Sequence, residues 1–296
     1  MIRSKGFGSK LADSFIYVIL IFVTFLCLAP LLNTVAISFS DKASAAGNMV
    51  YFWPVNFNLT SYTTLLGEKQ FFVSFGNSVL RVILGTTLNM VLTILMAYPL
   101  SKQVRSFKHR NIYMWFIVFT MLFNGGLIPW YLTVKNLHLL NSTVGMVLAA
   151  GAVPVFNVIL LMNFFRSVPK SLEEAAIVDG AGPWYTLIKI FIPISLPPIA
   201  TVMLFAIVYH WNDFFNALVL MSSPSKYPLQ TYIQQLTVQI NPLTLSNPDE
   251  LKRFSELSNR TFNGAKIVIS TIPLLIIYPF LQKYFITGIV MGSVKE

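Results

Sequence analysis

Six long apolar runs constrain the fold of this chain more than any other feature of its sequence. They cover residues 15–37, 78–100, 112–134, 142–165, 196–221 and 265–285, to within a few residues. A helix needs about twenty apolar residues to cross the hydrocarbon core of a bilayer. A helix also satisfies its backbone hydrogen bonds within one segment, as lipid requires. The sequence therefore predicts an all-α polytopic membrane protein, with six transmembrane helices in a single domain over residues 1–296.

The composition agrees with a membrane protein and argues against several other classes. Charged residues make up 11% of the chain, against about 25% in soluble domains. The net charge of +10 does not indicate nucleic-acid binding, because the Lys and Arg residues lie beside apolar runs rather than in one stripe. The single cysteine, Cys27, lies inside the first run and is expected to pack there. One cysteine and three scattered histidines do not form the ligand set of a zinc cluster.

The first apolar run resembles part of a signal peptide, since Ala43-Ser44-Ala45 looks like a cleavage site. The run exceeds twenty residues, whereas the apolar region of a signal peptide usually has about 7–15. We therefore expect this run to remain in the protein as its first transmembrane helix.

Positive charges beside the runs predict the orientation, because short cytoplasmic loops carry an excess of Lys and Arg. An N-terminus inside the cell makes the following residues cytoplasmic: Arg3, Lys5, Lys10, Lys102, Arg105, Lys108, Arg110, Arg166, Lys170, Lys189, Lys283 and Lys295. The short outer loop between the third and fourth runs then carries only Lys135. Both termini and residues 166–193 are therefore expected in the cytoplasm.

Two long segments, residues 38–76 and 222–264, are then expected outside the cell. In the first, Tyr51, Trp53 and Phe57 are predicted at the membrane interface, where amphipathic rings are favoured. The second is too long for a plain connector and is expected to have structure of its own. It is either a docking surface for an external protein or a cover over the helix ends.

Residues 166–193, RSVPKSLEEAAIVDGAGPWYTLIKIFIP, predict two short helices at the membrane surface. Ser171 and Glu174 have the spacing of a capping box, which starts a helix. Gly180 is placed to end that helix, and Pro183 suits the first turn of the next one. Such a pair is either a hinge that docks on a partner or a surface hairpin without one. One face of the first helix collects Leu172, Ala175, Ala176 and Asp179.

Polar side chains inside the runs are candidates for contact with a transported solute, because an ionisable group in a membrane usually faces a cavity or a partner. Aromatic rings beside Asn and Asp suit sugars, which have apolar CH faces and polar rims. Trp211 lies about 200° around the helix from Asp213, so it ranks after the neighbouring polar residues. Asp213 has a second interpretation as the partner of a basic group such as Arg81, and Asn89 could equally join two helices. The pathway candidates are Asn212, Asp213, Asn216, Tyr209, Trp211, Asn124, Asn157 and Arg81.

The sequence carries no recognisable catalytic motif. No phosphate-binding loop ending in Lys-Ser or Lys-Thr is present, so the chain is not expected to hydrolyse ATP. A Ser-His-Asp set and a helical HExxH motif are missing as well. We expect this chain to bind no cofactor or metal of its own, so energy must come from a partner or an ion gradient.

Three stretches resemble a known family. Glu174, Ala175, Ala176, Gly180, Ile190 and Pro193 match the EAA loop of binding-protein-dependent ABC importer permeases. Ile192 departs from the family, which usually has Leu there. FNGGLIPWYL at 123–132 and HWNDFFNALV at 210–219 resemble the carbohydrate-uptake branch, which is related to the maltose permeases. The permeases for oligosaccharides and aldouronates look most similar, along almost the whole chain.

The resemblance implies a type I importer permease in a bacterial plasma membrane. Such a subunit works with a second homologous permease, with two ATPases that bind ATP and Mg, and with an extracellular substrate-binding protein. The implied substrate is an oligosaccharide of plant cell-wall or algal type, uronate-containing ones included. A secondary transporter driven through Asp213 and His210 is the alternative. The cytoplasmic EAA helix implies coupling to the ATPases through Leu172, Glu173, Glu174, Ala175, Ala176, Asp179 and Gly180.

Overall fold

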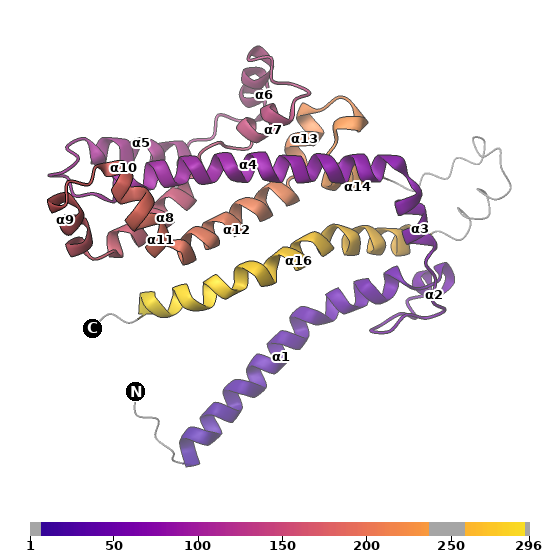
Figure 1. The fold of residues 1–296 in the computed structure, drawn as a ribbon. Helices are drawn as coiled ribbons and strands as arrows, with labels where there is room; N and C mark the ends of the chain where they lie inside the picture. Colours follow the sequence, from indigo (N-terminus) through magenta and orange to yellow (C-terminus); the bar gives the residue numbers. More distant parts are fainter. Residues whose placement is uncertain (1–6, 237–257, 294–296) are drawn as a thin grey trace. The chain divides into compact units, whose positions relative to one another are not determined.

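The computed structural model describes residues 7–236 and 258–293, and the regular structure within them is entirely helical. The predicted all-α class is therefore confirmed for this part of the chain. The chain separates into two compact units (Figure 1). Unit 1 comprises residues 1–68 and 236–272, and unit 2 comprises residues 69–235 and 273–296.

Unit 1 contains α1 (Phe7–Ser38), α2 (Lys42–Ala46), α3 (Thr60–Gly67) and the first part of α16 (Asn259–Ser293). α1 and α16 approach closely at Gly264, where an added Cβ would lie 3.2 Å from the carbonyl oxygen of Thr34. α3 joins them through Leu65, which packs with Phe262 in a small apolar cluster.

The apolar stretch of α1 is not buried by the rest of the described chain. Cys27 is exposed in the described chain, and its role as a packing residue stays a prediction. Tyr51, Trp53 and Phe57 are exposed as well, and their place at a membrane interface stays a prediction.

Unit 2 is organised around α4, an unbroken helix of 33 residues that packs against α8 and α12 (Figure 1). Its core contains Ala97 of α4, Leu161 of α8 and Val202 of α12, each fully buried. The second part of α16 adds Ile277 to a cluster on α12. The helices of unit 2 before the 166–193 segment are α4 (Lys69–Ser101), α5 (Arg110–Leu122), α6 (Leu127–Asn136), α7 (Thr143–Ala149) and α8 (Val155–Ser167). Those after it are α12 (Leu196–Asn212), α13 (Phe215–Leu220), η2 (Pro224–Lys226) and α14 (Leu229–Gln235).

Three described helices are long and apolar enough to cross a membrane, and up to five spans result if each bent helix pair counts as one. The predicted count of six is therefore not confirmed. The third predicted run bends by 112° between α5 and α6, where Gly126 has a φ of 87°. The fourth run is divided into α7 and α8 ahead of Pro154, which cannot donate a helical hydrogen bond.

Some sequence predictions fall outside the described residues. Arg3, Lys5 and Lys295 lie there, as does the part of the predicted extracellular loop at 237–257. The described part of that loop contains η2 and α14 and ends in the first turns of α16.

Candidate functional site

The segment 166–193 folds into two short helices that meet at a glycine. α9 spans Lys170–Val178, and the second helix runs through α10 (Pro183–Thr186), η1 (Leu187–Phe191) and α11 (Ile192–Ile194). Gly180 has a φ of 76°, and the N–H of Ala181 donates to the carbonyl of Ala176 at 2.8 Å. This closing bond confirms the predicted role of Gly180, because glycine adopts the left-handed conformation without a steric penalty. Pro183 occupies the first turn, as predicted.

The predicted capping box at Ser171 is wrong. α9 begins one residue earlier, at Lys170, and its N-cap is Pro169, which provides no side-chain hydrogen bond. The ring of proline fixes φ close to −65° and so favours a helix start at this point. Ser171 therefore lies inside the first turn, and Glu174 is free of a capping contact in the described chain.

α9 exposes much of its apolar surface. Val178 is 86% exposed, Ile177 62% and Leu172 40%, whereas Ala176 is buried. Of the predicted coupling residues, Glu174, Ala175, Asp179 and Gly180 are exposed and Glu173 is half-buried. A cleft of about 530 Å³ runs between α9 and the second helix, and Leu172, Ala175 and Lys189 contribute to its lining. Exposed large apolar side chains of this kind are common where a helix meets a partner.

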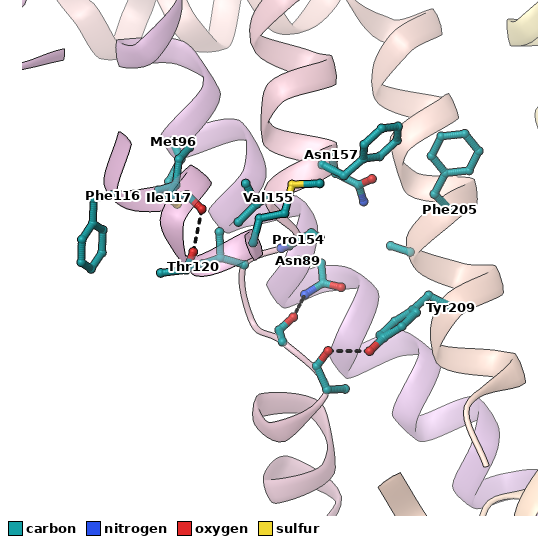
Figure 2. A pocket seen from close by; sticks show the side chains of 16 residues that line it. Asn89, Met96, Phe116, Ile117, Thr120, Pro154, Val155, Asn157, Phe205 and Tyr209 are labelled. Carbon is teal, nitrogen blue, oxygen red and sulfur yellow. Dashed lines mark hydrogen bonds between the residues drawn. The ribbon is translucent and has the colours of Figure 1, made fainter. Parts of the chain in front are cut away.

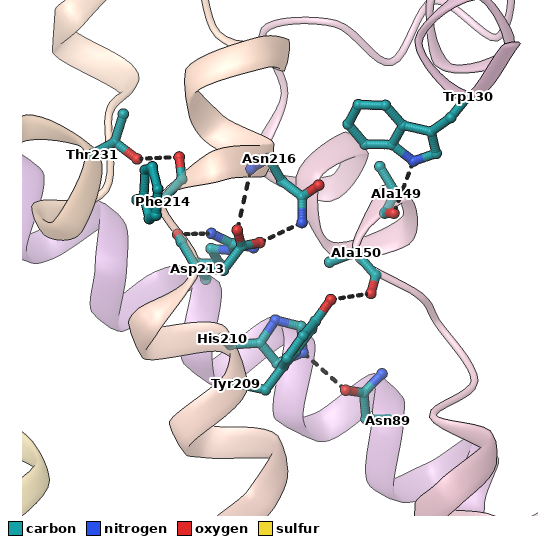
Figure 3. A network of polar contacts seen from close by, with 11 residues as sticks. Asn89, Trp130, Ala149, Ala150, Tyr209, His210, Asp213, Phe214, Asn216 and Thr231 are labelled. Carbon is teal, nitrogen blue, oxygen red and sulfur yellow. Dashed lines mark hydrogen bonds and ion pairs between the residues drawn. The ribbon is translucent and has the colours of Figure 1, made fainter. Parts of the chain in front are cut away.

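A second group of polar residues lies where α12 ends and α13 begins (Figure 3). Arg81 of α4 forms an ion pair with the carboxylate of Asp213, and its Nη1 donates to the Asp213 carbonyl at 2.8 Å. The N–H of Asn216 donates to the same carboxylate at 3.1 Å. The Arg81 side chain is 0% exposed and that of Asp213 only 9%. Both charges are therefore used within the chain, in line with the second interpretation of Asp213.

His210 and Asn89 continue this network toward the break between α7 and α8 (Figure 3). The Nδ2 of Asn89 donates to the carbonyls of Gly151 and Ala152 at 3.2 and 2.9 Å. These two bonds orient the amide so that its oxygen faces the Nε2 of His210 at 2.9 Å. Nε2 must then carry the proton, because an amide oxygen only accepts hydrogen bonds.

A cavity of about 1120 Å³ lies beside this network, between α4, α5, α8 and α12 (Figure 2). Tyr209 lies at its edge and donates to the carbonyl of Ala150 at 2.6 Å. The lining is mainly apolar and aromatic, with a few hydrogen-bonding groups, as is common in ligand sites. The lining side chains labelled in Figure 2 are Asn89, Met96, Phe116, Ile117, Thr120, Pro154, Val155, Asn157, Phe205 and Tyr209.

The predicted pathway residues do not form one site. Tyr209 and Asn157 line the cavity, whereas Arg81, Asp213 and Asn216 belong to the network. The remaining three lie elsewhere: Asn212 is exposed, Trp211 is buried with its ring edge-on to Phe75, and Asn124 accepts a hydrogen bond from the N–H of Gly126. Sequence reasoning did not single out Thr120, and a lone threonine in an apolar run gives no signal that could identify it.

Bent spans around a buried polar network and a cavity are the construction of a membrane transport protein. The family model described as "Binding-protein-dependent transport system inner membrane component" matches residues 89–291. The chain belongs to this family, and it is therefore a multi-pass membrane permease of an ABC importer.

Relatives and a solved structure agree with this family. The chain is 36% identical to the polygalacturonan/rhamnogalacturonan transport system permease protein YtcP of Bacillus subtilis (strain 168), over 97% of this chain and 99% of that protein. It is 39% identical to protein LplC of the same organism, over 90% and 88% of the two chains. A chain of the crystal structure of a bacterial ABC transporter involved in the import of the acidic polysaccharide alginate superimposes with a TM-score of 0.81. That chain is 31% identical, over 95% of this chain and 99% of its own length.

Proposed function

We propose that this chain moves an oligosaccharide into a bacterial cell by alternating access and is driven by separate ATPase subunits through α9. The single observation that carries the coupling role is the two-helix hinge at Gly180, with an exposed apolar and acidic α9 on one side of it. A short amphipathic helix of this kind suits a groove on a partner protein. Leu172 and Ala175, which share one face of α9, would fill the groove, and Glu174 would face its polar rim.

The family implies the other subunits of the complex, and separate ATPases are needed because the sequence has no phosphate-binding loop of its own. The chain pairs with a second homologous permease to enclose the pathway, and two ATPases hold ATP and Mg. An extracellular binding protein delivers the sugar to the outward-facing state. Both termini and α9 lie on the cytoplasmic side, where the ATPases can reach them. In this arrangement ATP binding closes the ATPases, moves α9 and rocks the spans.

The cavity supports a sugar as the substrate. The rings of Phe116, Phe205 and Tyr209 offer faces for apolar CH groups, and Asn157 offers an amide for hydroxyl groups. The names of YtcP and of the alginate transporter place polysaccharide-derived substrates among relatives of this chain. We propose a plant cell-wall or algal oligosaccharide, with uronate-containing ones included.

A uronate also needs positive charge, and the cavity lining contains no charged side chain. Arg81, the basic residue that the sequence offered for this purpose, is paired with Asp213. We propose that the second permease supplies positive charge along the path. The same pairing argues against the ion-gradient alternative, because the Asp213 carboxylate is held by Arg81 and Asn216 rather than facing the cavity.

Uptake by proteoliposomes tests the energy source. The chain is co-reconstituted with its second permease and ATPase, and labelled uronate oligosaccharide is supplied on the binding protein. We expect uptake to require enclosed ATP and to continue when a protonophore and a sodium ionophore together collapse the proton and sodium gradients. Vesicles with enclosed ADP are the control. Uptake that needs a gradient and ignores ATP would refute the proposed function.

A further inference from the structure

Lys102 occupies a closed site at the end of α4. Its side chain is only 13% exposed, and its Nζ lies 2.7 Å from an oxygen of Glu173 in α9. The same Nζ lies 4.0 Å from the ring centroid of Tyr98 and 4.2 Å from that of Phe191. A cation within about 6 Å of an aromatic face is attracted by the ring quadrupole. Lys102 is therefore held from three sides by α4, α9 and η1.

The rings beneath Lys102 belong to the buried core of unit 2. Phe165 of α8 and Phe191 of η1 meet edge to face at 5.6 Å, and Tyr98 meets Phe191 in the same way at 5.0 Å. Phe165 and Phe191 are 2% and 3% exposed. This cluster cannot shift without disturbing a close-packed core, so the ammonium of Lys102 has a rigid base.

α9 has few other attachments to the described chain. Of its nine residues only Ala176 is buried, and within the described residues its one ion pair is the bond from Glu173 to Lys102. Phe191 ends a π-helical turn, a feature that often occurs at functional positions. Movement of α9 would therefore pull first on Lys102 and on the turn that ends at Phe191.

α4 connects this point directly to the cavity. The helix is continuous from Lys69 to Ser101, and Asn89, which lines the cavity, precedes Lys102 by thirteen residues. At 1.5 Å of rise per residue the two positions are roughly 20 Å apart. Gly85 and Arg81 lie about one and two turns beyond Asn89 on the same helix. Gly85 leaves room for the His210 ring, and Arg81 donates to the Asp213 carbonyl.

We propose that Lys102 is the positioning residue through which displacement of α9 is transmitted to α4 and so to the cavity. This inference rests on the proposed function, because it presumes that α9 receives the ATPase. The Lys102 ammonium joins α9 to α4 through its ion pair with Glu173. The rings of Tyr98 and Phe191 hold the ammonium in place when α9 moves. Neither Lys102 nor Glu173 lines the cavity. Loss of the link therefore separates ATP hydrolysis from transport and leaves the binding of ATP and of sugar intact.

The test compares ATP hydrolysed with sugar transported in the reconstituted complex. Lys102→Met keeps most of the aliphatic packing and removes the charge. We expect it to retain ATP hydrolysis and to transport at least tenfold less sugar per ATP. Lys102→Arg should restore most of the ratio. Arg105→Met and Lys108→Met are matched controls, because both residues are exposed in the same loop and neither contacts Glu173.

A charge exchange gives a second measurement. Glu173→Lys should uncouple as Lys102→Glu does, and the double variant should recover coupling in part. An unchanged ratio in Lys102→Met, or a double variant no better than the worse single one, would overturn the inference. A wild-type complex without ATP-driven uptake would instead refute the proposed function.

Alkaline pH tests the same link in the wild-type protein. Burial lowers the pKa of Lys102 below 10.5, the usual value for lysine, and the Glu173 carboxylate partly opposes this shift. Between the lowered pKa of Lys102 in the folded chain and 10.5, the unfolded chain binds more protons than the folded chain, so the free energy of unfolding rises with pH. The ion pair with Glu173 is lost over the same pH range. Wild-type coupling should therefore fall at a lower pH than that of Lys102→Arg, whose guanidinium stays charged. Parallel pH profiles would count against the role of Lys102. Lys102 and Glu173 line a cleft of about 490 Å³, whose other charged side chains are Arg110, Arg166, Lys170 and Glu174.

Discussion

At the residue scale, the buried charge of Arg81 serves the backbone as well as a partner carboxylate. Arg81 is fully buried in α4, and it offsets the cost of that burial by holding both the carboxylate and the carbonyl of Asp213. Removing one member of such a pair typically costs about 3–5 kcal/mol, because the other charge stays buried without a partner. Loss of transport after substitution of Asp213 would therefore report first on the structure around the α12–α13 break.

Gly85 supplies a sharper test of this network. A Cβ added there would lie 2.4 Å from the Nε2 of His210, so Gly85→Ala must displace the ring and break its bond to Asn89. We expect a loss of about 1–3 kcal/mol of stability, the usual range for overpacking a core. Thermal unfolding of the detergent-solubilised protein measures it.

Gly76→Ala is the matched control for this substitution. It lies on the same helix, and an added Cβ there meets nothing within 4 Å. The control should unfold at or slightly above the wild-type temperature, because alanine favours helix over glycine by about 1 kcal/mol. His210→Ala should relieve the Gly85→Ala defect. An equal effect of both alanine variants would contradict the packing described here.

At the scale of whole elements, the broken helices explain the polar residues within the spans. Each break leaves backbone carbonyls without a helical hydrogen bond, and in a membrane these carbonyls need donors from inside the protein. The Asn89 side chain donates to the carbonyls of Gly151 and Ala152. Tyr209 donates to the carbonyl of Ala150, and Arg81 donates to that of Asp213. Two of the pathway candidates chosen from sequence, Tyr209 and Arg81, thus donate to backbone carbonyls at these breaks.

The turn between α9 and the next helix makes a prediction at this scale. Gly180→Ala places a side chain in the left-handed region at a cost of about 1–2 kcal/mol. We expect it to re-aim α9 and weaken the affinity of the permease pair for the ATPase about tenfold, without changing membrane insertion. Gly182→Ala is the control, because its φ is −74° and an added Cβ meets nothing within 4 Å. Titration of the ATPase onto the permease pair in nanodiscs measures both. Equal affinities would contradict the role of the turn.

The sequence allowed a prediction of the class and the hinge, and it offered the Arg81–Asp213 contact only as one of two interpretations of Asp213. Apolar runs and a glycine with its flanking proline are local signals, and the all-α fold, Gly180 and Pro183 were predicted from them. The six-span count was not confirmed, because short helices such as α7 and α8 do not differ from one long run in composition. The contact between Arg81 and Asp213 joins positions 132 residues apart. Sequence alone could not decide between this pairing and contact of Asp213 with a solute.

For the molecule as a whole, the exposed apolar surfaces show what this chain needs around it. α1 is apolar and uncovered in the described chain, as a lipid-facing helix would be. The cavity has no charged lining residue, and α9 is held by few contacts. Each feature fits one subunit of a larger importer, in which lipid, a second permease and an ATPase cover different surfaces.

The central claim is that α9 couples this permease to an ATPase, and ATPase activity in lipid tests it most directly. The complex is reconstituted in nanodiscs, and binding protein is added empty or loaded with a uronate oligosaccharide. We predict at least tenfold stimulation by the loaded form, reduced in Glu174→Gln and lost in Glu174→Lys, with complex assembly verified by gel filtration. Stimulation that survives Glu174→Lys, or a complex that binds no ATPase at all, would contradict the claim.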